Sequence, residues 1–252
     1  MIEIFILSLI QGITEFLPVS SSSHLVLTSQ YLNFENQSLS IDVSLHIGSF
    51  IAVIVYFYRD IKNFYENRDL FFKVLISSAP VMVIGFLLVE TNMIERLRNI
   101  QIVAWTTIIF GILLYASDKF KLEKNIKKNF SYRSAIFIGL LQILSLIPGV
   151  SRSGIGITAA RFLKFKRVDS AKISFLISIP ILGAVSIFGF KNLVFSNDLS
   201  FSLLNLFSIF LSFLFSFITI KYFLKYIKKF NLNIFVYYRI CLGLILIILS
   251  FL

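Results

Sequence analysis

The sequence predicts an all-α integral membrane protein with six transmembrane helices and two re-entrant helix-break-helix hairpins, arranged as an inverted-topology repeat. The first observation is composition: of 252 residues, 57% are hydrophobic and only 15% are charged, whereas soluble domains carry about 25% charged residues. The second is that the apolar residues form long stretches, two of which are interrupted by proline and serine. The third is that the basic residues fall almost entirely on one side of the resulting topology.

Five apolar stretches contain no Asp, Glu, Lys or Arg, and a sixth contains only Arg239. The six stretches are Val43–Tyr58, Val74–Val89, Ile100–Ser117, Ile173–Phe190, Leu199–Ile220 and Phe230–Leu252. A helix needs roughly 20 predominantly apolar residues to cross the hydrocarbon core, and each stretch reaches this length with its flanks. We interpret Arg239, beside Tyr237 and Tyr238, as an interfacial anchor that extends toward the lipid headgroups.

Two further apolar stretches are too short to cross and are broken by polar residues. Their first arms are Ile4–Thr14 and Ser134–Ile147, their breaks are Glu15–His24 and Pro148–Ser153, and their second arms end near Leu32 and Leu163. We expect each hairpin to enter and leave the membrane by the same face. Irregular backbone at this depth must be surrounded by protein or a water-filled cavity, so the two breaks are expected inside the bundle.

The loop charges set the expected orientation. With six spans and two re-entrant hairpins, 19 of the 24 Lys and Arg residues lie on one side, and only Arg96, Arg98 and Lys191 lie on the other. The positive-inside rule makes the 19-residue side cytoplasmic, so the termini and the mouth of the first hairpin face outward. Because these loops explain the net charge of +11, we expect no nucleic-acid partner.

An internal repeat supports the same topology. The segment Gln11–Ser20 resembles Gln142–Ser151, and about 20 residues after the proline of each segment an Asp, Asp42 or Asp169, opens a full span. We therefore expect a single membrane domain, 1–252, with one repeat at about 1–117 and the other at about 134–252. Inverted repeats in transporters place a site near the membrane midplane, between paired broken helices.

Glu15 is an acid within an apolar helix, and an ionisable group at membrane depth indicates function by default. Gln11 lies one turn earlier, so the two side chains share a helix face. A carboxylate and an amide oxygen suit the hard divalent cations Mg²⁺ and Ca²⁺, and a cation held by Gln11 and Glu15 would bridge to phosphate. The plainer alternative is a structural ion pair between Glu15 and Arg152.

Four serines and a histidine follow Pro18 in the first break. They are Ser20, Ser21, Ser22, Ser23 and His24. Hydroxyl groups and free backbone N–H groups at the start of a helix bind anions, and Ser21 or His24 can serve as a nucleophile, with His24 also a candidate acid or base. The alternatives are a helix N-cap for the serines and a satisfied core position for the histidine.

The tip of the second hairpin reads Pro148-Gly-Val-Ser-Arg-Ser-Gly154. Its Arg152 stays charged, and the planar guanidinium suits phosphate oxygens, while glycines permit close approach of the backbone to a ligand. We therefore predict phosphate binding here, with Gly149, Ser151, Ser153 and Gly154 beside Arg152. A second histidine, His46, lies inside the first span, where we favour a hydrogen bond within the core.

These residues resemble the two signature motifs of the bacterial undecaprenyl-diphosphate phosphatases. The first motif is Gly12-Ile-Thr-Glu-Phe-Leu-Pro-Val-Ser-Ser21 followed by His24, and the second is Leu146-Ile-Pro-Gly-Val-Ser-Arg-Ser-Gly154. Weaker similarity runs through Asp42–Tyr56 and Ser174–Gly183, and the spacing fits over nearly the whole chain.

The resemblance implies a bacterial plasma-membrane hydrolase that removes the terminal phosphate from undecaprenyl diphosphate. The monophosphate carrier then returns to peptidoglycan synthesis, and overproduction of such enzymes is associated with bacitracin resistance because the drug sequesters the diphosphate. The resemblance also implies roles in metal binding and catalysis for Glu15 and the position of Gln11, in nucleophilic attack for Ser21 and His24, and in diphosphate binding for Arg152. Monomer and homodimer are both left open.

Three departures from the family pattern bear on these expectations. Gln11 stands where the family often has Glu, which weakens a metal site with two carboxylates; Ser22-Ser23 replaces Thr-Gly, and Ile155-Gly156 replaces Ala-Thr. The residues with implied catalytic roles are all kept, so we expect activity. The alternative function is a polyprenyl-phosphate flippase or an ion-coupled transporter without hydrolysis, which an inverted repeat suits equally.

Overall fold

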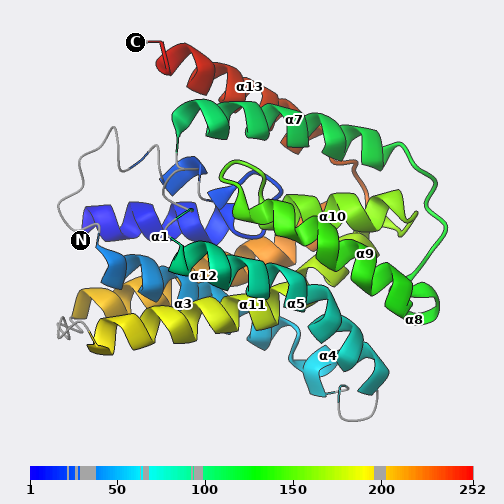
Figure 1. Ribbon diagram of the computed structural model, residues 1–252, viewed down its shortest axis with the longest axis horizontal. Coiled ribbons are helices and arrows are strands. Elements are labelled where there is room, and N and C mark those ends of the chain that lie inside the picture. The colour runs from blue at the N-terminus through cyan, green and yellow to red at the C-terminus, as the bar shows by residue number, and fades with distance from the viewer. Residues whose placement is uncertain are drawn as a thin grey trace.

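The computed structural model describes residues 1–21, 23–25, 28, 38–62, 64, 68–91, 93, 99–195 and 203–251, with the side chains of 192–195 excepted. Within these ranges the chain is helical, apart from connecting segments and one isolated bridge. The helices are α1 (Ile2–Thr14), α3 (Leu39–Tyr56), α4 (Tyr58–Lys62), α5 (Arg68–Glu90), α7 (Ile100–Asp118), α8 (Ile126–Asn129), α9 (Tyr132–Gln142), the 3₁₀ helix η1 (Ile143–Leu146), α10 (Arg152–Phe162), α11 (Arg167–Phe195), α12 (Leu203–Ile227) and α13 (Asn233–Leu249) (Figure 1).

Five described helices are long and apolar enough to cross a membrane: α3, α5, α7, α11 and α12. Three shorter apolar segments accompany them, namely α1, α9 with η1, and α13. The prediction of an all-helical, multi-pass membrane protein is therefore confirmed. The predicted span over Phe230–Leu252 corresponds to α13, which has 17 residues and is among the shorter helices.

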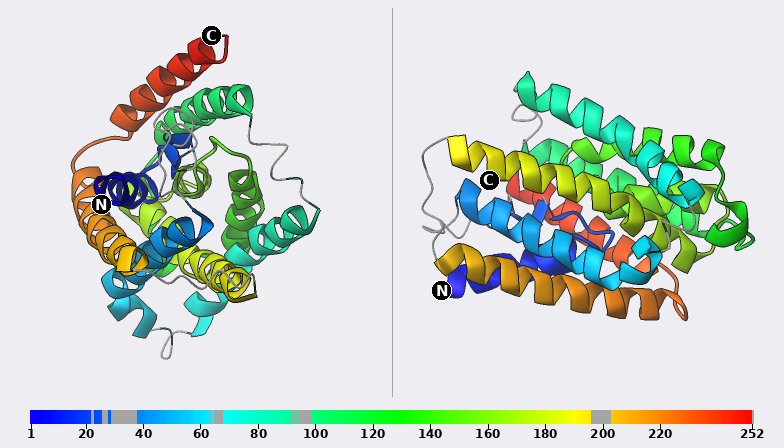
Figure 2. Two further views of the ribbon diagram at one scale, coloured as in Figure 1. Left: turned by 90° about the vertical axis from the view of Figure 1, so that its left-hand side faces the viewer. Right: turned by 90° about the horizontal axis from the view of Figure 1, so that it is seen from below.

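The helices form a bundle, with α13 at its periphery and α10 in its interior (Figure 1, Figure 2). Helix α3 packs on α12 and α11, α5 packs on α9 and α11, and α7 packs on α13. Viewed end-on, α10 lies inside this bundle (Figure 2). All nine residues of α10 from Ser153 to Arg161 are buried, so the second hairpin places its polar tip in the interior of the molecule.

The second hairpin returns to the end of the bundle from which it starts. Lys124, before α9, and Phe165, after α10, form a parallel bridge. The backbone N–H of Lys124 donates to the Lys164 carbonyl over 3.0 Å, and that of Lys166 donates to the Lys124 carbonyl over 2.9 Å. Between these points, α9 tightens into η1 and stops at Ile147, because the residue before a proline disfavours the helical conformation.

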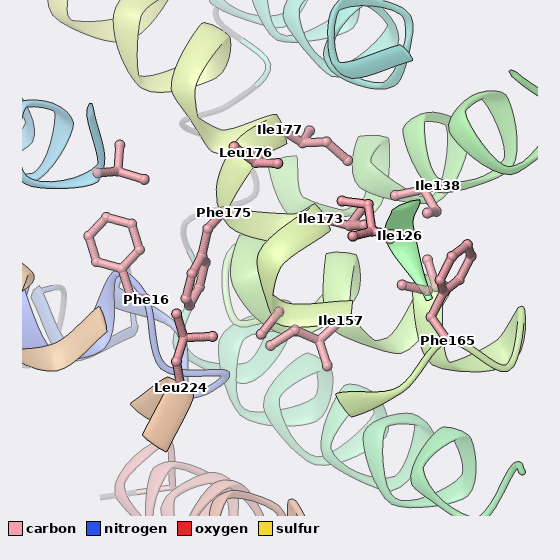
Figure 3. Close-up of a cluster of buried hydrophobic side chains, with 14 of the residues drawn as sticks. Phe16, Ile126, Ile138, Ile157, Phe165, Ile173, Phe175, Leu176, Ile177 and Leu224 are labelled. Atoms are coloured by element: carbon pink, nitrogen blue, oxygen red, sulfur yellow. The ribbon is translucent and has the colours of Figure 1, made fainter. Parts of the chain in front are cut away.

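An aromatic cluster fixes the break of the first hairpin. Phe16, two residues beyond α1, is fully buried and meets Phe175 of α11 edge to face, with ring centroids 5.3 Å apart (Figure 3). Phe175 in turn contacts Phe223 of α12 at 6.0 Å. The backbone next to Glu15 is thus held by the main hydrophobic core.

A buried ionic network closes one end of the bundle. Asp118, the last residue of α7, accepts from Arg167 over 2.7 Å, lies 3.5 Å from Arg161, and accepts from the backbone N–H of Leu232 over 3.2 Å. Arg161 is fully buried and also donates to the carbonyls of Phe165 and Phe120. The network ties α7, α10, α11 and the α12–α13 connection together.

Small residues allow α3 and α12 to pack closely. A Cβ atom on Gly48 would meet the carbonyl oxygen of Ile209 and would lie 2.8 Å from the Cβ of Ser212. Beside it, the Ser49 hydroxyl lies 3.2 Å from that of Ser212 and 3.0 Å from that of Ser216. Small residues and interhelical hydroxyl contacts are the usual means of helix association in membranes.

We predict that Gly48→Ala destabilises the protein by about 1–3 kcal/mol, because the added methyl group meets backbone atoms that cannot move aside. Thermal unfolding in detergent measures the effect. The matched control is Gly85→Ala, where a Cβ would meet only the flexible end of Leu146, at 3.2 Å. An equal loss of stability in both variants would contradict this account of the α3–α12 contact.

Candidate active site

The first break places an acid and a hydroxyl side by side. Helix α1 ends at Thr14, and Glu15 forms its C-cap with only 7% of its surface exposed. The chain then turns through Pro18 and Val19 to Ser20, whose φ of 74° lies in the left-handed region. Because helical geometry resumes at Ser21, the Ser21 hydroxyl is directed back at Glu15, six residues earlier.

The Glu15 carboxylate is the centre of the site. Its Oε1 accepts from Arg152 Nη2 over 2.5 Å, and its Oε2 accepts from Ser21 Oγ over 2.8 Å and from Gln11 Nε2 over 3.1 Å. His46 of α3 also interacts electrostatically with Glu15. The structure therefore brings together both predicted breaks, which are more than 100 residues apart in the sequence.

Arg152 is the first residue of α10, at the tip of the second hairpin. Besides Glu15, its guanidinium contacts the Ser178 carbonyl of α11, which accepts from Nη1 over 3.4 Å. The guanidinium has five N–H donors, so these two contacts leave capacity for anion binding. The side chain remains 14% exposed. The structural ion pair with Glu15 that the sequence allowed is therefore present, and the guanidinium still has N–H donors free for a ligand.

The small residues of the second tip mainly build the loop. Ser151 has a φ of 70° and accepts from the Gly154 N–H over 3.1 Å, which starts α10. The Ser153 hydroxyl donates to the Leu17 carbonyl of the first break over 2.7 Å. Gly149, with a φ of 92°, is a position where a Cβ would collide with the Thr106 hydroxyl. The predicted substrate contacts of these residues stay predictions.

The serines of the first break divide into two groups. Ser20 accepts from the Ser23 N–H over 3.4 Å and lies 2.9 Å from the Ser23 hydroxyl, and both residues are buried. They adopt the capping arrangement that the sequence also allowed. Ser21 is only half-buried and is directed at Glu15. The predicted contribution of Ser22 lies outside the described residues.

His24 has a defined tautomer. Its Nδ1 lies 2.7 Å from the carbonyl oxygen of Ser20, and since a carbonyl only accepts, Nδ1 carries the proton of the neutral ring. Nε2 is then the acceptor, and it lies 2.5 Å from the hydroxyl of Tyr238. The two rings are stacked, with centroids 5.7 Å apart. Among the described residues, no hydrogen bond joins His24 to Glu15 or Arg152.

Arg239 and Tyr238 of α13 also lie at the site, and neither was expected there from the sequence. Arg239 is fully buried and donates to backbone carbonyls of both breaks, so its interpretation as an interfacial anchor was wrong. The signal that could have found it is that it is the only charged residue of its span. Nothing in the sequence pointed to the contact between Tyr238 and His24.

His46 forms a hydrogen bond within the protein, as expected. His46 Nδ1 lies 2.8 Å from the Asp42 carbonyl, one turn earlier on α3, which is a hydrogen bond within its own helix. The sequence did not indicate that His46 interacts electrostatically with Glu15.

The residues around Glu15 fit a hard divalent cation only in part. Gln11 Oε1 is buried and has no hydrogen-bond partner, which makes it an acceptor beside a carboxylate. No group of three His, Cys, Asp or Glu side chains in the described part of the chain could hold a metal ion by itself. A cation at Gln11 and Glu15 would therefore need oxygen atoms from a ligand or from water to complete its coordination.

The whole chain is similar to known proteins. Residues 4–245 match the family model described as bacitracin resistance protein BacA. A protein of Pelagibacter ubique named undecaprenyl-diphosphatase is 48% identical over 99% of this chain and 98% of its own length. Proteins of Jannaschia sp., named undecaprenyl-diphosphatase, and of Pseudoalteromonas translucida, named undecaprenyl-diphosphatase 1, are 36% and 39% identical over 98% of this chain, and cover 98% and 97% of their own lengths.

A double-mutant cycle tests the contact between the two breaks. We predict that Glu15→Gln and Arg152→Gln each destabilise the fold by about 3–5 kcal/mol, because each leaves a buried charge without its partner, and that the double variant loses less than the sum. The control pair is Lys172 and Asp60, at 2.5 Å with both side chains about a quarter exposed, where we expect a coupling of about 0.2–1 kcal/mol. Equal couplings for the two pairs would show that Glu15 and Arg152 do not form a buried pair.

Proposed function

Because the chain belongs to the bacitracin resistance protein BacA family, we infer that it is an undecaprenyl-diphosphatase. It is a hydrolase that converts undecaprenyl diphosphate into undecaprenyl phosphate and inorganic phosphate, and so returns the lipid carrier to peptidoglycan synthesis. The observation that carries the assignment of its site is the convergence of Arg152, Ser21 and Gln11 on Glu15. Phosphoryl transfer depends mainly on positioning and charge stabilisation, and these groups can supply both.

We propose that the two hairpins are re-entrant and that six helices, α13 included, cross the membrane as an inverted repeat. The meeting of Lys124 with Phe165 supports a second hairpin that leaves by the face it entered. The helix pairings support the repeat: α1 packs on α12 as α9 packs on α5, and α3 packs on α12 as α11 packs on α5. These pairs are equivalent when the first half, about 1–117, is matched to the second, about 134–252.

The site is proposed to face outward. Both chain termini lie at one end of the bundle, and the basic connections around α4 and α8 lie at the other (Figure 1). With 19 basic residues assigned to the second end, the positive-inside rule makes that end cytoplasmic. The first break, which follows α1 from the outward end, then opens to the outer surface of a bacterial plasma membrane.

Ser21 is the proposed nucleophile. Its hydroxyl is half-buried and hydrogen-bonded to a carboxylate that can take its proton. Both ring nitrogens of His24 are engaged, Nδ1 with Ser20 and Nε2 with Tyr238, which favours the hydroxyl over the imidazole as the attacking group. We propose His24 as an acid or base toward the substrate.

The proposed reaction has two steps. Ser21 Oγ attacks the terminal phosphorus and its proton passes to Glu15, while the bond from that phosphorus to the bridging oxygen breaks and undecaprenyl phosphate leaves. Glu15 gives up this proton to solvent, then accepts one from a water molecule that attacks the phosphoserine. The bond between phosphorus and Ser21 Oγ breaks, inorganic phosphate departs, and Glu15 passes the proton from water to Oγ, which restores the Ser21 hydroxyl. Arg152 binds the oxygens of the transferred group throughout, since its planar donors match phosphate geometry.

Gln11 and Glu15 are the residues that would hold a divalent cation, Mg²⁺ or Ca²⁺. The unpartnered Oε1 of Gln11 beside Glu15 supports this proposal. When bound, the cation would neutralise charge on the diphosphate.

The polyprenyl tail is proposed to lie in a lipid-facing groove between α3 and α11. This groove has a volume of about 600 Å³ and is lined mainly by apolar residues, among them Ile47, Phe50, Ile187 and Phe190. Among its lining residues, Ile47 directly follows His46 in the sequence of α3. A tail in this groove stays in contact with the bilayer while the diphosphate enters the polar site.

We predict that purified protein in detergent releases phosphate from a C55 diphosphate and that Arg152→Ala, measured at a temperature where the destabilised variant is still folded, has a kcat/KM lower by several orders of magnitude. Arg152→Lys should have a kcat/KM between those of the wild type and Arg152→Ala, because it keeps the charge and loses the planar pair of donors. The control is Arg133→Ala, at an exposed position of α9. Near-normal turnover by Arg152→Ala would contradict its role, and a wild type that moves lipid between leaflets of vesicles without releasing phosphate would favour a transporter.

We predict that chelation of divalent cations abolishes phosphate release, and that Gln11→Glu lowers the cation concentration for half-maximal activity by about tenfold or more, because ligand charge raises affinity. Gln11→Met, which removes the amide oxygen, should raise the cation concentration for half-maximal activity. Calorimetric titration with the metal alone gives a second readout that is independent of turnover. Metal binding that is the same in all three proteins would exclude Gln11 from the cation site.

A further inference from the structure

Arg239 is a buried cation whose partners are backbone carbonyls. Its Nε donates to the Thr107 carbonyl over 3.1 Å, Nη1 donates to Val150 over 3.0 Å and to Pro18 over 3.3 Å, and Nη2 donates to Gly149 over 2.8 Å. No carboxylate of the described residues forms an ion pair with it. A charge in such a place is expensive, so these carbonyl contacts must offset a large desolvation cost.

The carbonyls that Arg239 binds belong to the two breaks. Pro18 lies between Glu15 and Ser21 in the first break, and Val150 lies two residues before Arg152 in the second. Backbone carbonyls in a break have no helical partner and must find one in an apolar interior. A single planar guanidinium supplies donors to both loops, and so sets the distance between the backbone that carries Ser21 and the backbone that carries Arg152.

The surrounding sequence makes room for this side chain. A Cβ atom on Gly111 of α7 would lie 3.1 Å from the Cβ of Arg239, and one on Gly154 of α10 would lie 3.1 Å from Nη1. Gly154, which the sequence suggested as a point of substrate approach, thus also admits the Arg239 guanidinium. Thr106 holds the second break from the same side, because its hydroxyl donates to the Pro148 carbonyl over 2.6 Å.

We propose that Arg239 is a positioning residue, which clamps the tips of the two hairpins so that Ser21 and Glu15 stay aligned with the phosphorus held by Arg152. The proposal rests on the proposed function. Arg239 acts through the carbonyls of Pro18, Gly149 and Val150 and does not touch the substrate. Loss of the clamp therefore affects the alignment of the attacking atom more than the affinity for phosphate.

The test uses full-length Arg239→Lys in detergent, which keeps the positive charge and loses the planar fork that reaches both loops. We expect kcat to fall about 10²-fold, as for an attacking group misplaced by about 1 Å. KM for the C55 diphosphate and the inhibition constant of inorganic phosphate should stay within threefold of the wild type. The wild type's own phosphate release decides the proposed function separately, before any variant is compared.

The matched control is Arg161→Lys, because Arg161 is also fully buried and also donates to carbonyls, but at the Asp118 end of the bundle. Both variants are expected to lose similar thermal stability, and only Arg239→Lys should lose kcat. Parallel losses of kcat in the two variants would overturn the proposal, as would normal kcat in Arg239→Lys. A rise in KM and in the phosphate inhibition constant with unchanged kcat would also overturn it, since Arg239 would then bind the substrate.

A milder variant keeps the test decisive if Arg239→Lys fails to fold. Gly111→Ala adds a methyl group next to the Arg239 Cβ and removes no donor. We expect a smaller loss of kcat in the same direction, with KM unchanged. Unchanged kcat in a folded Gly111→Ala protein whose Tm has shifted would count against the clamp.

Discussion

The rest of the structure depends on one constraint: two irregular loops lie inside an apolar helix bundle, and their backbone groups must be satisfied there. The second hairpin solves this with Thr106, Ser151 and Arg239, which bind or cap the backbone around Pro148 and Val150. In the first, Ser20 accepts from the Ser23 N–H, and the Leu17 and Pro18 carbonyls accept from Ser153 and Arg239. Once both loops are held, their polar side chains have a fixed place in which to meet.

The two loops contribute different chemical groups to the site. The first break supplies the acid, the hydroxyl and the imidazole, and the second supplies the guanidinium. Arg152 is compensated by Glu15, so neither charge is left unpaired in the interior. A diphosphate offers Arg152 a stronger partner, which would leave the Glu15 carboxylate to accept the proton of Ser21. The structural interpretation of Glu15 as an ion-pair partner is therefore compatible with its proposed role in catalysis.

Close packing around the site gives it rigidity. Phe16, which follows Glu15 in the chain, packs in the aromatic cluster of Phe175 and Phe223, and Gly48 lets α3 approach α12. At the opposite end, Asp118 with Arg161 and Arg167 holds α7, α10 and α11 together. Arg239 therefore fixes the tips of both hairpins, and the Asp118 network fixes the base of the second hairpin. A site held in this way is preorganised, which favours catalysis.

The sequence by itself determined the all-helical membrane class and singled out Glu15, the polar run from Ser20 to His24, and Arg152, because charged and polar groups within apolar stretches are costly and stand out. It could not determine which residues satisfy the breaks. Whether an arginine such as Arg239 extends to the headgroups or turns inward depends on carbonyls that distant segments bring to it. Likewise, only the left-handed backbone at Ser20 decides that Ser21 faces Glu15, and only the packing of α13 brings Tyr238 to His24. Composition and periodicity report the cost of burying a group, whereas its partners are set by tertiary contacts between residues far apart in the chain.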